Sequence, residues 1–427
     1  MRQIRLKIAP YVLLVSLLIG SCFTANAAVT AMQEQDYTSY RGSVIGYDNT
    51  PLVFVTLFVT GTNISTITNT EGNYLLKVPN EHINSTLELS LLGYQTKIIK
   101  LSELDKDKAK ITMEVEISVL DEVSITRFTD AYALVKQVFK KRADNTLNQT
   151  TKMTAFYRET IKKRKRNVSL TEAVVNLYKQ PNTNSIKDVV ALNKARKSTD
   201  YKRLDTIAVK LQGGPFSTLY LDVMKYPEYI FTESTFDLYD FSLSKASTIN
   251  ERPVYVIEFK QKDIIFEPLY YGKLFIDTET LALSSAVYQL NLSNKKLASE
   301  LFVKRKPGDV EVTPVSANYR VDYRERNGRW FYGYGSVDIS FRINKKRKLF
   351  NSVYTLNSEM AITDWEVVSR QDIVKPKDRM RPTMVISDEI SGFSDPDFWG
   401  AYNVIEPEKS IENAIGKIQK QLKRQKG

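Results

Sequence analysis

The chain is poor in the residues that carry much of enzyme chemistry. Among its 427 residues there is a single cysteine, Cys22, and a single histidine, His82. A lone cysteine cannot form an intrachain disulfide, and one histidine cannot supply the ligand set of a zinc peptidase. His82 lies in the segment 79–85, where we expect an exposed loop. The sequence therefore predicts no metal and no cofactor.

Sequence patterns that mark catalytic or nucleotide-binding sites are also missing. There is no G-x-S-x-G elbow for a serine nucleophile, and neither G-x-x-x-x-G-K-[ST] nor G-x-G-x-x-G occurs. Gly333-x-Gly335 falls inside an expected strand, where it indicates a bend or a bulge. These absences predict a protein without catalytic residues, one that is not an enzyme.

Long hydrophobic runs are absent except at residues 11–19, and this run is shorter than the ~20 residues that span a bilayer. Basic residues precede it, namely Arg2, Arg5 and Lys7. This pattern is typical of a secretory signal peptide, which we place at residues 1–27. We therefore expect an exported protein of the periplasm or outer membrane, with no transmembrane span after processing.

Two processing sites compete in this N-terminal segment. Ala25-Asn26-Ala27 is an A-x-A signal that would leave a soluble chain beginning at Ala28, and we favour this form. Residues 19–22 resemble a lipobox, in which Cys22 would be lipidated and would tether the protein to a membrane.

Charge of positive sign dominates, with a formal net charge of +12. Such an excess favours an acidic partner such as lipopolysaccharide, anionic lipid or an acidic protein, although a well-solvated surface explains it equally simply. The basic run 162–166 is expected at a hairpin tip, where it is either a solvated turn or a contact for lipopolysaccharide phosphates. Export makes a nucleic-acid partner improbable, so we expect none.

Residues 38–125 read as a series of short strands separated by turns. The expected strands cover 40–47, 52–59, 65–70, 74–78, 87–92, 94–99 and 111–115. Asp-Asn-Thr-Pro at 48–51, Gly61-Thr62-Asn63 and Glu71-Gly72-Asn73 supply turn residues between them. Short strands at this spacing predict an antiparallel β-sandwich.

This region resembles the carboxypeptidase regulatory-like module that often opens TonB-dependent receptors. The matching elements are Pro51-Leu52, Gly61-Thr62, Thr66-x-Thr68, residues 71–74, Leu92-Gly93-Tyr94 and the exit at residues 120–123. Phe54-Val55, Ser65 and Asn69 depart from the common Gly-Ala, Gly and Asp, which we expect to alter turn detail only. The resemblance implies a transthyretin-like sandwich without catalytic residues, and it groups the chain with exported carboxypeptidase-like regulatory domain-containing proteins.

The rest of the chain divides into a linker helix at 126–145, a large β domain at 150–390 and a C-terminal segment at 391–427 that ends in a helix. Thr129 can cap the linker helix, and the negative charge of Asp130 suits the positive N-terminus of a helix. Its apolar residues recur at helical spacing, which predicts packing against a core.

Long alternating segments predict that residues 150–390 form a curved, largely antiparallel sheet. The segments are 153–161, 168–178, 253–260, 269–277, 283–292, 315–325 and 329–341. Asn327-Gly328 is a strong hairpin signal, and residues 277–280 predict another turn. Residues 179–204 are polar and are expected to form a loop or lid, whereas 213–229 has helical spacing. The strand–turn–strand element resembles half-barrel folds of the lipoprotein-carrier type.

Aromatic residues are the main candidates for a binding site. Tyrosine and tryptophan could line an apolar concavity of the sheet for a lipid or hydrophobic peptide, although about half of them could instead fill the core. The candidates are Tyr255, Tyr271, Tyr288, Tyr323, Trp330 and Tyr332. An open concavity would favour ligand binding, and a filled one would favour a scaffold.

Three functions follow from these observations. We expect a non-enzymatic envelope protein that binds an apolar ligand or an outer-membrane or periplasmic protein. The first alternative is an assembly or regulatory factor for an outer-membrane transport or secretion machine. The second is a carboxylate-dependent glycan hydrolase, although no spacing selects a pair among the acids Glu159, Glu172, Asp222, Glu233, Glu258 and Glu267.

Overall fold

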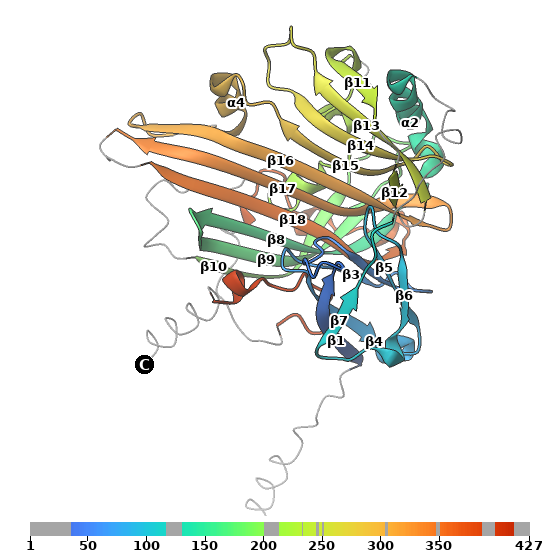
Figure 1. Ribbon diagram of the computed structural model, residues 1–427. Helices are drawn as coiled ribbons and strands as arrows, with labels where there is room; N and C mark the ends of the chain where they lie inside the picture. Colours follow the sequence, from blue (N-terminus) through green and yellow to red (C-terminus); the bar gives the residue numbers. More distant parts are fainter. Residues whose placement is uncertain are drawn as a thin grey trace, which may run out of the picture.

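The computed structural model describes residues 36–116, 130–199, 213–232, 234–244, 247–249, 252–303, 306–346, 351–386 and 398–413. Several expectations lie outside these residues, namely the signal peptide with Cys22, the module exit at 120–123, Thr129, Glu233 and the later part of the C-terminal helix. The predicted fold class is confirmed: a β-sandwich precedes a large, open, curved antiparallel sheet with few helices (Figure 1).

The sandwich contains a 3-stranded sheet in the order β4-β1-β7 and a 4-stranded sheet in the order β3-β2-β5-β6. The strands are β1 Tyr37–Ile45, β2 Thr56–Val59, β3 Ser65–Ile67, β4 Asn73–Pro79, β5 Thr86–Ser90, β6 Lys97–Lys100 and β7 Ala109–Thr112. Short 3-10 turns are η1 Asn80–His82 and η2 Leu101–Glu103. Apolar side chains of both sheets, among them Val44, Leu57 and Leu76, form one buried core.

Two details of the sandwich differ from the prediction. β1 and β7 pair in parallel, so the sandwich is not wholly antiparallel. The chain between them contributes β4 to the same sheet and builds the whole of the other sheet, and such a long connection permits parallel pairing. The strand expected at 52–59 begins only at Thr56, because Phe54 has a φ of 64° and interrupts the extended backbone. Phe54 stands where the resembling modules commonly have glycine, the residue that adopts positive φ at little cost.

The large sheet is 11-stranded, in the order β10-β9-β8-β18-β17-β16-β15-β14-β13-β11, with β12 also paired to β13. Its strands are β8 Thr151–Lys163, β9 Arg166–Lys179, β10 Val189–Thr199, β11 Tyr239–Leu243, β12 Ser247–Ile249, β13 Arg252–Gln261, β14 Tyr270–Asp277, β15 Leu283–Leu290, β16 Val310–Arg326, β17 Arg329–Lys345 and β18 Ser352–Val367. All pairs are antiparallel, and the non-local pairing of β18 with β8 joins the two ends of this part of the chain.

Turn and bulge signals in the sequence are confirmed. Asn327 and Gly328 have φ values of 52° and 74° and connect β16 to β17 as a tight hairpin. Asp322 pairs with Tyr334 whereas Tyr323 pairs with Tyr332, so Gly333 is the extra residue of a β-bulge.

The prediction of a loop or lid at residues 179–204 was wrong for the part that forms β10. Val189–Thr199 pairs with β9 along its length, and β10 ends the sheet. An edge strand has one solvated side and commonly carries charged residues that discourage pairing with other chains. This explains why β10, with Lys194, Arg196 and Lys197, resembles a polar loop in the sequence pattern.

One face of the sheet, which we call the inner face, is covered by helices and turns. These are α2 Ala131–Asn145, α3 Phe216–Leu219, η3 Pro227–Tyr229 and η4 Phe236–Leu238. The Asp130 carboxylate caps α2 by accepting hydrogen bonds from the amides of Tyr132 and Ala133. Apolar residues of α2 and of residues 216–236 join the inner face in one continuous core. The remaining short elements are α4 Lys295–Phe302, η5 Arg370–Asp372 and η6 Pro376–Asp378.

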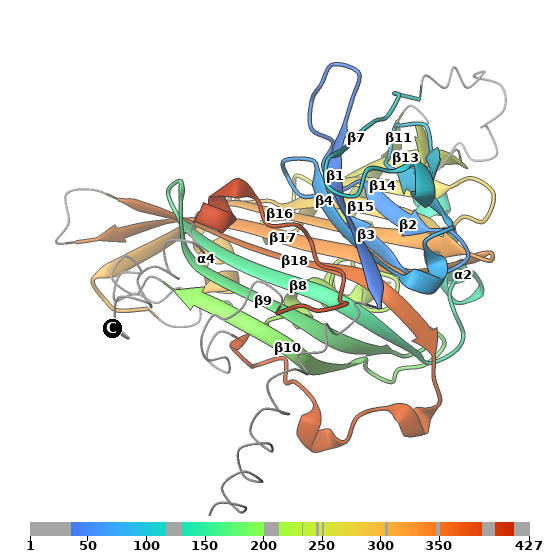
Figure 2. The ribbon, with the colours of Figure 1, turned by 90° about the horizontal axis from the view of Figure 1, so that it is seen from below.

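The opposite, outer face carries the sandwich and the segment 398–406 (Figures 1 and 2). Trp399 packs edge-on against Phe156 of β8, with ring centroids 5.5 Å apart. Asn403 accepts a hydrogen bond from the Lys77 amide at 2.6 Å and donates one to the Lys77 carbonyl at 2.9 Å. The segment therefore lies as a connecting layer between the sandwich and the large sheet.

Candidate functional site

The inner concavity of the sheet, where the aromatic candidates were expected to line a cavity, is filled. Tyr255, Tyr323, Trp330 and Tyr332 are all buried in its core. The Tyr323 hydroxyl donates to Asp222 at 2.9 Å, and the Tyr332 hydroxyl donates to the Thr218 carbonyl at 3.1 Å. Tyr323 and Tyr332 thus hold the segment 216–236 on the sheet. That any of the four contacts a ligand stays a prediction.

A buried ionic cluster lies at the edge of this core. The Lys179 ammonium lies 2.6 Å from one oxygen of Asp188 and 2.6 Å from one oxygen of Asp222. Burial by itself lowers the pKa of Lys179, but the two carboxylates raise the pKa above its ordinary value. Lys179 therefore stays charged, and the cluster ties β9 to the covering segment.

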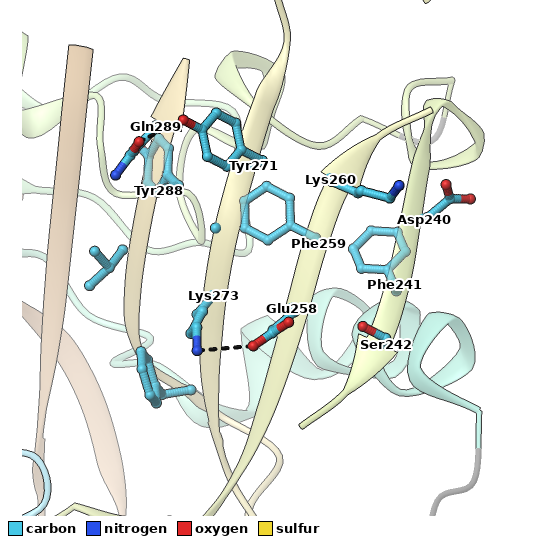
Figure 3. Close-up of a pocket in the computed structure, with 13 residues that line it drawn as sticks. Asp240, Phe241, Ser242, Glu258, Phe259, Lys260, Tyr271, Lys273, Tyr288 and Gln289 are labelled. Atoms are coloured by element: carbon cyan, nitrogen blue, oxygen red, sulfur yellow. Dashed lines mark hydrogen bonds and ion pairs between the residues drawn. The ribbon is translucent and has the colours of Figure 1, made fainter. Parts of the chain in front are cut away.

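A different cavity lies on the outer face of β11, β13, β14 and β15 (Figure 3). We call it the outer hollow, and its volume is about 740 Å³. It is lined by Asp240, Phe241, Ser242, Glu258, Phe259, Lys260, Tyr271, Gly272, Lys273, Phe275, Val287, Tyr288 and Gln289. Of the aromatic candidates, Tyr271 faces outward into this hollow. Tyr288 also borders it, but its ring is buried and belongs to the core of the inner face.

Strand alternation decides which side chains face the hollow. On β14, Leu274 and Ile276 enter the inner core, so Tyr271, Lys273 and Phe275 face outward. The hydrophobic side chains on this outward face are unusual, because a solvated sheet face normally carries polar residues. Val287 on neighbouring β15 is 38% exposed, so the apolar floor of the hollow meets solvent.

Polar groups flank this apolar floor. Lys273 and Glu258 pair across the strands with an N–O distance of 2.9 Å, and the Tyr271 hydroxyl donates to Gln289 at 2.7 Å (Figure 3). Both members of the ion pair are about half exposed, so the pair contributes little to stability and can exchange partners. The hollow thus combines an apolar floor with charges that a polar head could meet.

Gly272 lets the strands under the hollow come close together. A Cβ atom there would lie 2.2 Å from the Val287 carbonyl oxygen and 2.6 Å from the Tyr288 Cα. A glycine within a strand often marks such a close approach, so Gly272 was a sequence signal that could have pointed to the hollow. The adjacent hydrophobic residues Tyr270 and Tyr271 could not reveal which one faces outward.

The acids considered for glycan hydrolysis are scattered. Glu172 is buried between Arg158 at 2.8 Å and Arg196 at 2.7 Å. Burial alone would raise the pKa of Glu172, but the two guanidinium groups hold it below its ordinary value. Glu159 faces the inner core, where burial raises its pKa to about 7 and a hydrogen bond from Tyr157 opposes the shift.

The remaining acids give no shielded pair. Asp222 belongs to the buried cluster, and Glu267 is exposed in the β13–β14 connection. Asp240 and Glu258 both line the outer hollow, but both are exposed to solvent. A glycosidase acid is shielded from water so that it remains protonated, which these two positions do not provide.

The basic run lies where it was expected, at the hairpin between β8 and β9. Arg164 has a φ of 55° at the tip, and Lys162 lies 4.0 Å from Glu408 of the C-terminal segment. Its contact with lipopolysaccharide stays a prediction.

His82 ends η1 and is partly exposed.

Two other features are absent from the described residues. No group of three or more His, Cys, Asp or Glu side chains there could hold a metal ion. No helix in the same part of the chain has both the length and the apolar character needed to cross a membrane.

Comparison with known proteins gives a family for the sandwich. Residues 40–125 match the family model of the CarboxypepD_reg-like domain, which agrees with the resemblance seen in the sequence. The curated proteins contain no match to the chain.

Solved structures with low overall similarity cover more than half of the chain. One is described as an outer membrane lipoprotein-sorting protein domain from Vibrio parahaemolyticus, with 10% identity, 58% of this chain and 95% of that chain covered, and a TM-score of 0.25. A DUF1329 family protein from Desulfovibrio piger has 10% identity, coverage of 58% and 96%, and a TM-score of 0.23. A LolA superfamily protein from Nitrosomonas europaea has 9% identity, coverage of 57% and 98%, and a TM-score of 0.18.

Proposed function

We propose that this chain is a non-enzymatic binding protein of the cell envelope, and that its ligand is an amphipathic molecule held in the outer hollow. One observation carries the proposal: a cavity of about 740 Å³ exposes Phe275 and Val287 on a sheet face that faces solvent. Ligand sites typically have volumes of roughly 300–1,000 Å³ and a mostly apolar lining with a few polar groups.

The lining indicates the chemistry of the ligand. An apolar body, such as an acyl chain, would lie on Phe275, Val287 and the Tyr271 ring. A charged or hydroxylated head would meet Lys260 and the ion pair of Lys273 with Glu258, which is solvated enough to accept a new partner. The envelope location rests on the N-terminal export signal and on the matched module.

Val287→Glu tests the ligand site directly, because it adds a carboxylate to the apolar floor. The protein would be purified from the envelope fraction, and retained molecules would be detected by native mass spectrometry and solvent extraction. We expect the wild type to retain an amphipathic molecule and Val287→Glu to lose it. Val315→Glu is the matched control, since Val315 is a strand valine that is 48% exposed and lies outside the hollow.

Equal retention by Val287→Glu and Val315→Glu, with both variants folded, would refute the assignment of the hollow. An empty wild type would also count against a small ligand. The tyrosine fluorescence and melting temperature of each variant would show that loss of ligand is not loss of fold.

A second function is favoured by the filled inner face, because a sheet without an inner ligand cavity can act as a docking scaffold. In that case the outer hollow receives a segment of an envelope protein, and the chain acts in the assembly of a membrane machine. Crosslinking and co-purification from the envelope would distinguish the two. A protein partner lost in Val287→Glu, together with no retained small molecule, would support docking.

A further inference from the structure

The connection between β13 and β14, residues 262–269, presents two apolar side chains to solvent. Ile264 is 75% exposed and Phe266 is 78% exposed. No other large hydrophobic residue in the described ranges exceeds either value. Single exposed hydrophobic residues are common on protein surfaces, but two that share one short connection form a local apolar surface.

The connection is held in a fixed shape by a buried side chain. The Gln261 amide nitrogen donates to the carbonyls of Ile265 at 2.8 Å and Glu267 at 3.2 Å. Its amide oxygen accepts a hydrogen bond from the Leu269 backbone at 2.8 Å. Because these bonds already order the backbone of the connection, binding of Ile264 and Phe266 to a partner would cost little further conformational entropy.

Lysines lie beside this connection. Asn294 caps α4 by accepting from the Leu297 amide at 3.3 Å, and its side chain donates to the Phe266 carbonyl at 3.5 Å. The N-terminus of α4, with exposed Lys295 and Lys296, therefore lies next to the connection, which itself carries Lys262. The connection also carries two acids, Asp263 and Glu267, against one lysine, so its own net charge is −1 and the surface becomes positive only through Lys295 and Lys296 of α4.

We propose that this loop–α4 surface, made of Ile264, Phe266, Lys262, Lys295 and Lys296, binds the surface of a bilayer that contains anionic phospholipid. Ile264 and Phe266 enter the boundary between head groups and acyl chains, and the lysine ammonium groups meet phosphates. Apolar side chains flanked by lysines match the two layers of such an interface. The chain's net charge of +12, which becomes +9 without Arg2, Arg5 and Lys7 of the expected signal peptide, supports the same choice of partner.

A bilayer fits this surface better than a protein partner does. A specific protein interface needs roughly 1,000 Å² or more with good complementarity, which two projecting side chains cannot supply. Reversible contact with a membrane needs only a small apolar area and a charge attraction. The proposal does not depend on a ligand in the outer hollow, although β13 and β14 contribute to both places.

Flotation with lipid vesicles tests the proposal. Vesicles of phosphatidylcholine alone and of phosphatidylcholine with phosphatidylglycerol would be mixed with the full chain purified from the envelope. Every protein would carry Cys22→Ser, so that acylation cannot attach it to a vesicle. The variants are Ile264→Ser with Phe266→Ser, and Lys295→Glu with Lys296→Glu. Ile98→Ser is the control, because Ile98 is a 64% exposed isoleucine on the sandwich.

The parent protein should bind the anionic vesicles more strongly than the neutral ones. The apolar double variant should lower the partition coefficient at least roughly tenfold, because partial burial of two side chains contributes at least ~1.4 kcal/mol. The lysine double variant should lower it on anionic vesicles only, and Ile98→Ser should match the parent.

Two results would overturn the inference. One is a parent protein that does not float with anionic vesicles, and the other is an apolar double variant that floats as well as Ile98→Ser. Retention of the hollow's ligand, measured separately, would be unchanged in the loop variants. A failure here therefore leaves the test of the outer hollow intact.

Discussion

Phe54 offers a sharp test of how the sandwich meets the large sheet. Its φ of 64° lies in the left-handed region, which costs a residue with a Cβ atom about 1–2 kcal/mol. Its ring lies 5.3 Å from the Tyr334 ring, and the Arg320 guanidinium lies 4.9 Å from the Phe54 ring. The chain thus retains a strained phenylalanine whose ring contacts the other unit.

We compare Phe54→Ala with Phe54→Gly. Both variants lose the ring, and since Phe54 is only half-buried we expect each to lose about 2 kcal/mol, less than the ~3–5 kcal/mol of a core phenylalanine. The variants differ in backbone strain, which alanine keeps and glycine removes. Against this gain, glycine is destabilising by about 0.5–1 kcal/mol, because a glycine loses more conformational entropy on folding than an alanine does. The glycine variant should therefore be more stable than the alanine variant by about 0.75 kcal/mol, the middle of a range of about 0–1.5 kcal/mol.

Phe58 provides the matched control in the same sheet. It is half-buried in β2, has no positive φ, and its ring lies 5.7 Å from the Arg326 guanidinium. Phe58→Gly should be less stable than Phe58→Ala, the reverse of the order at Phe54. Urea unfolding followed by tryptophan fluorescence would measure both orders, since Trp399 belongs to the same apolar cluster as Phe54. If glycine is the less stable replacement at both positions, the strain argument fails.

Two buried charged sites give further predictions. Burial raises the pKa of Glu159 from its ordinary value of 4.5 to about 7 in the folded protein. Between these two pH values the folded protein holds the proton and the unfolded chain does not. The free energy of unfolding should therefore fall as the pH rises from about 4.5 to 7. The loss is about 3 kcal/mol and should disappear in Glu159→Gln, as urea titrations of both proteins at pH 5 and pH 8 would reveal. Lys179→Met should cost about 3–5 kcal/mol, because it leaves Asp188 and Asp222 buried together without their cation. Adding Asp188→Asn and Asp222→Asn should restore part of that stability in thermal melts, and no recovery would show that the charges are not the cause.

Local sequence signals predicted the elements well where short-range physics decides them. Asn327-Gly328 fixes a hairpin because both residues accept positive φ, and Gly333 marks a bulge because it lacks a side chain. β10 was missed because an edge strand tolerates charge on its residues, so its composition resembles a loop. The parallel pairing of β1 with β7 depends on the path of the whole intervening chain, which local patterns do not encode.

The candidate site was only partly predictable for a related reason. Alternation indicates that neighbours such as Tyr270 and Tyr271 face opposite sides, but not which side becomes covered. Residues 216–236 cover the inner face, so Tyr323 and Tyr332 became core whereas Tyr271 remained at the surface. The decisive information lies in contacts between segments about 100 residues apart, such as the bond between Tyr323 and Asp222.

The position of the sandwich matters for the outer hollow because a row of polar contacts connects them. Phe54 of the sandwich lies under Arg320, and Arg320 donates to Asp322 at 2.7 Å. Asp322 also accepts a hydrogen bond from Ser285 at 2.6 Å, and Ser285 pairs with Phe275 at the floor of the hollow. Residues of β16, β15 and β14 thus place the module and the hollow on one continuous outer face. The module lies on the part of that face that includes β16, β17 and β18. The hollow lies farther along the same face, where β11, β13, β14 and β15 line it.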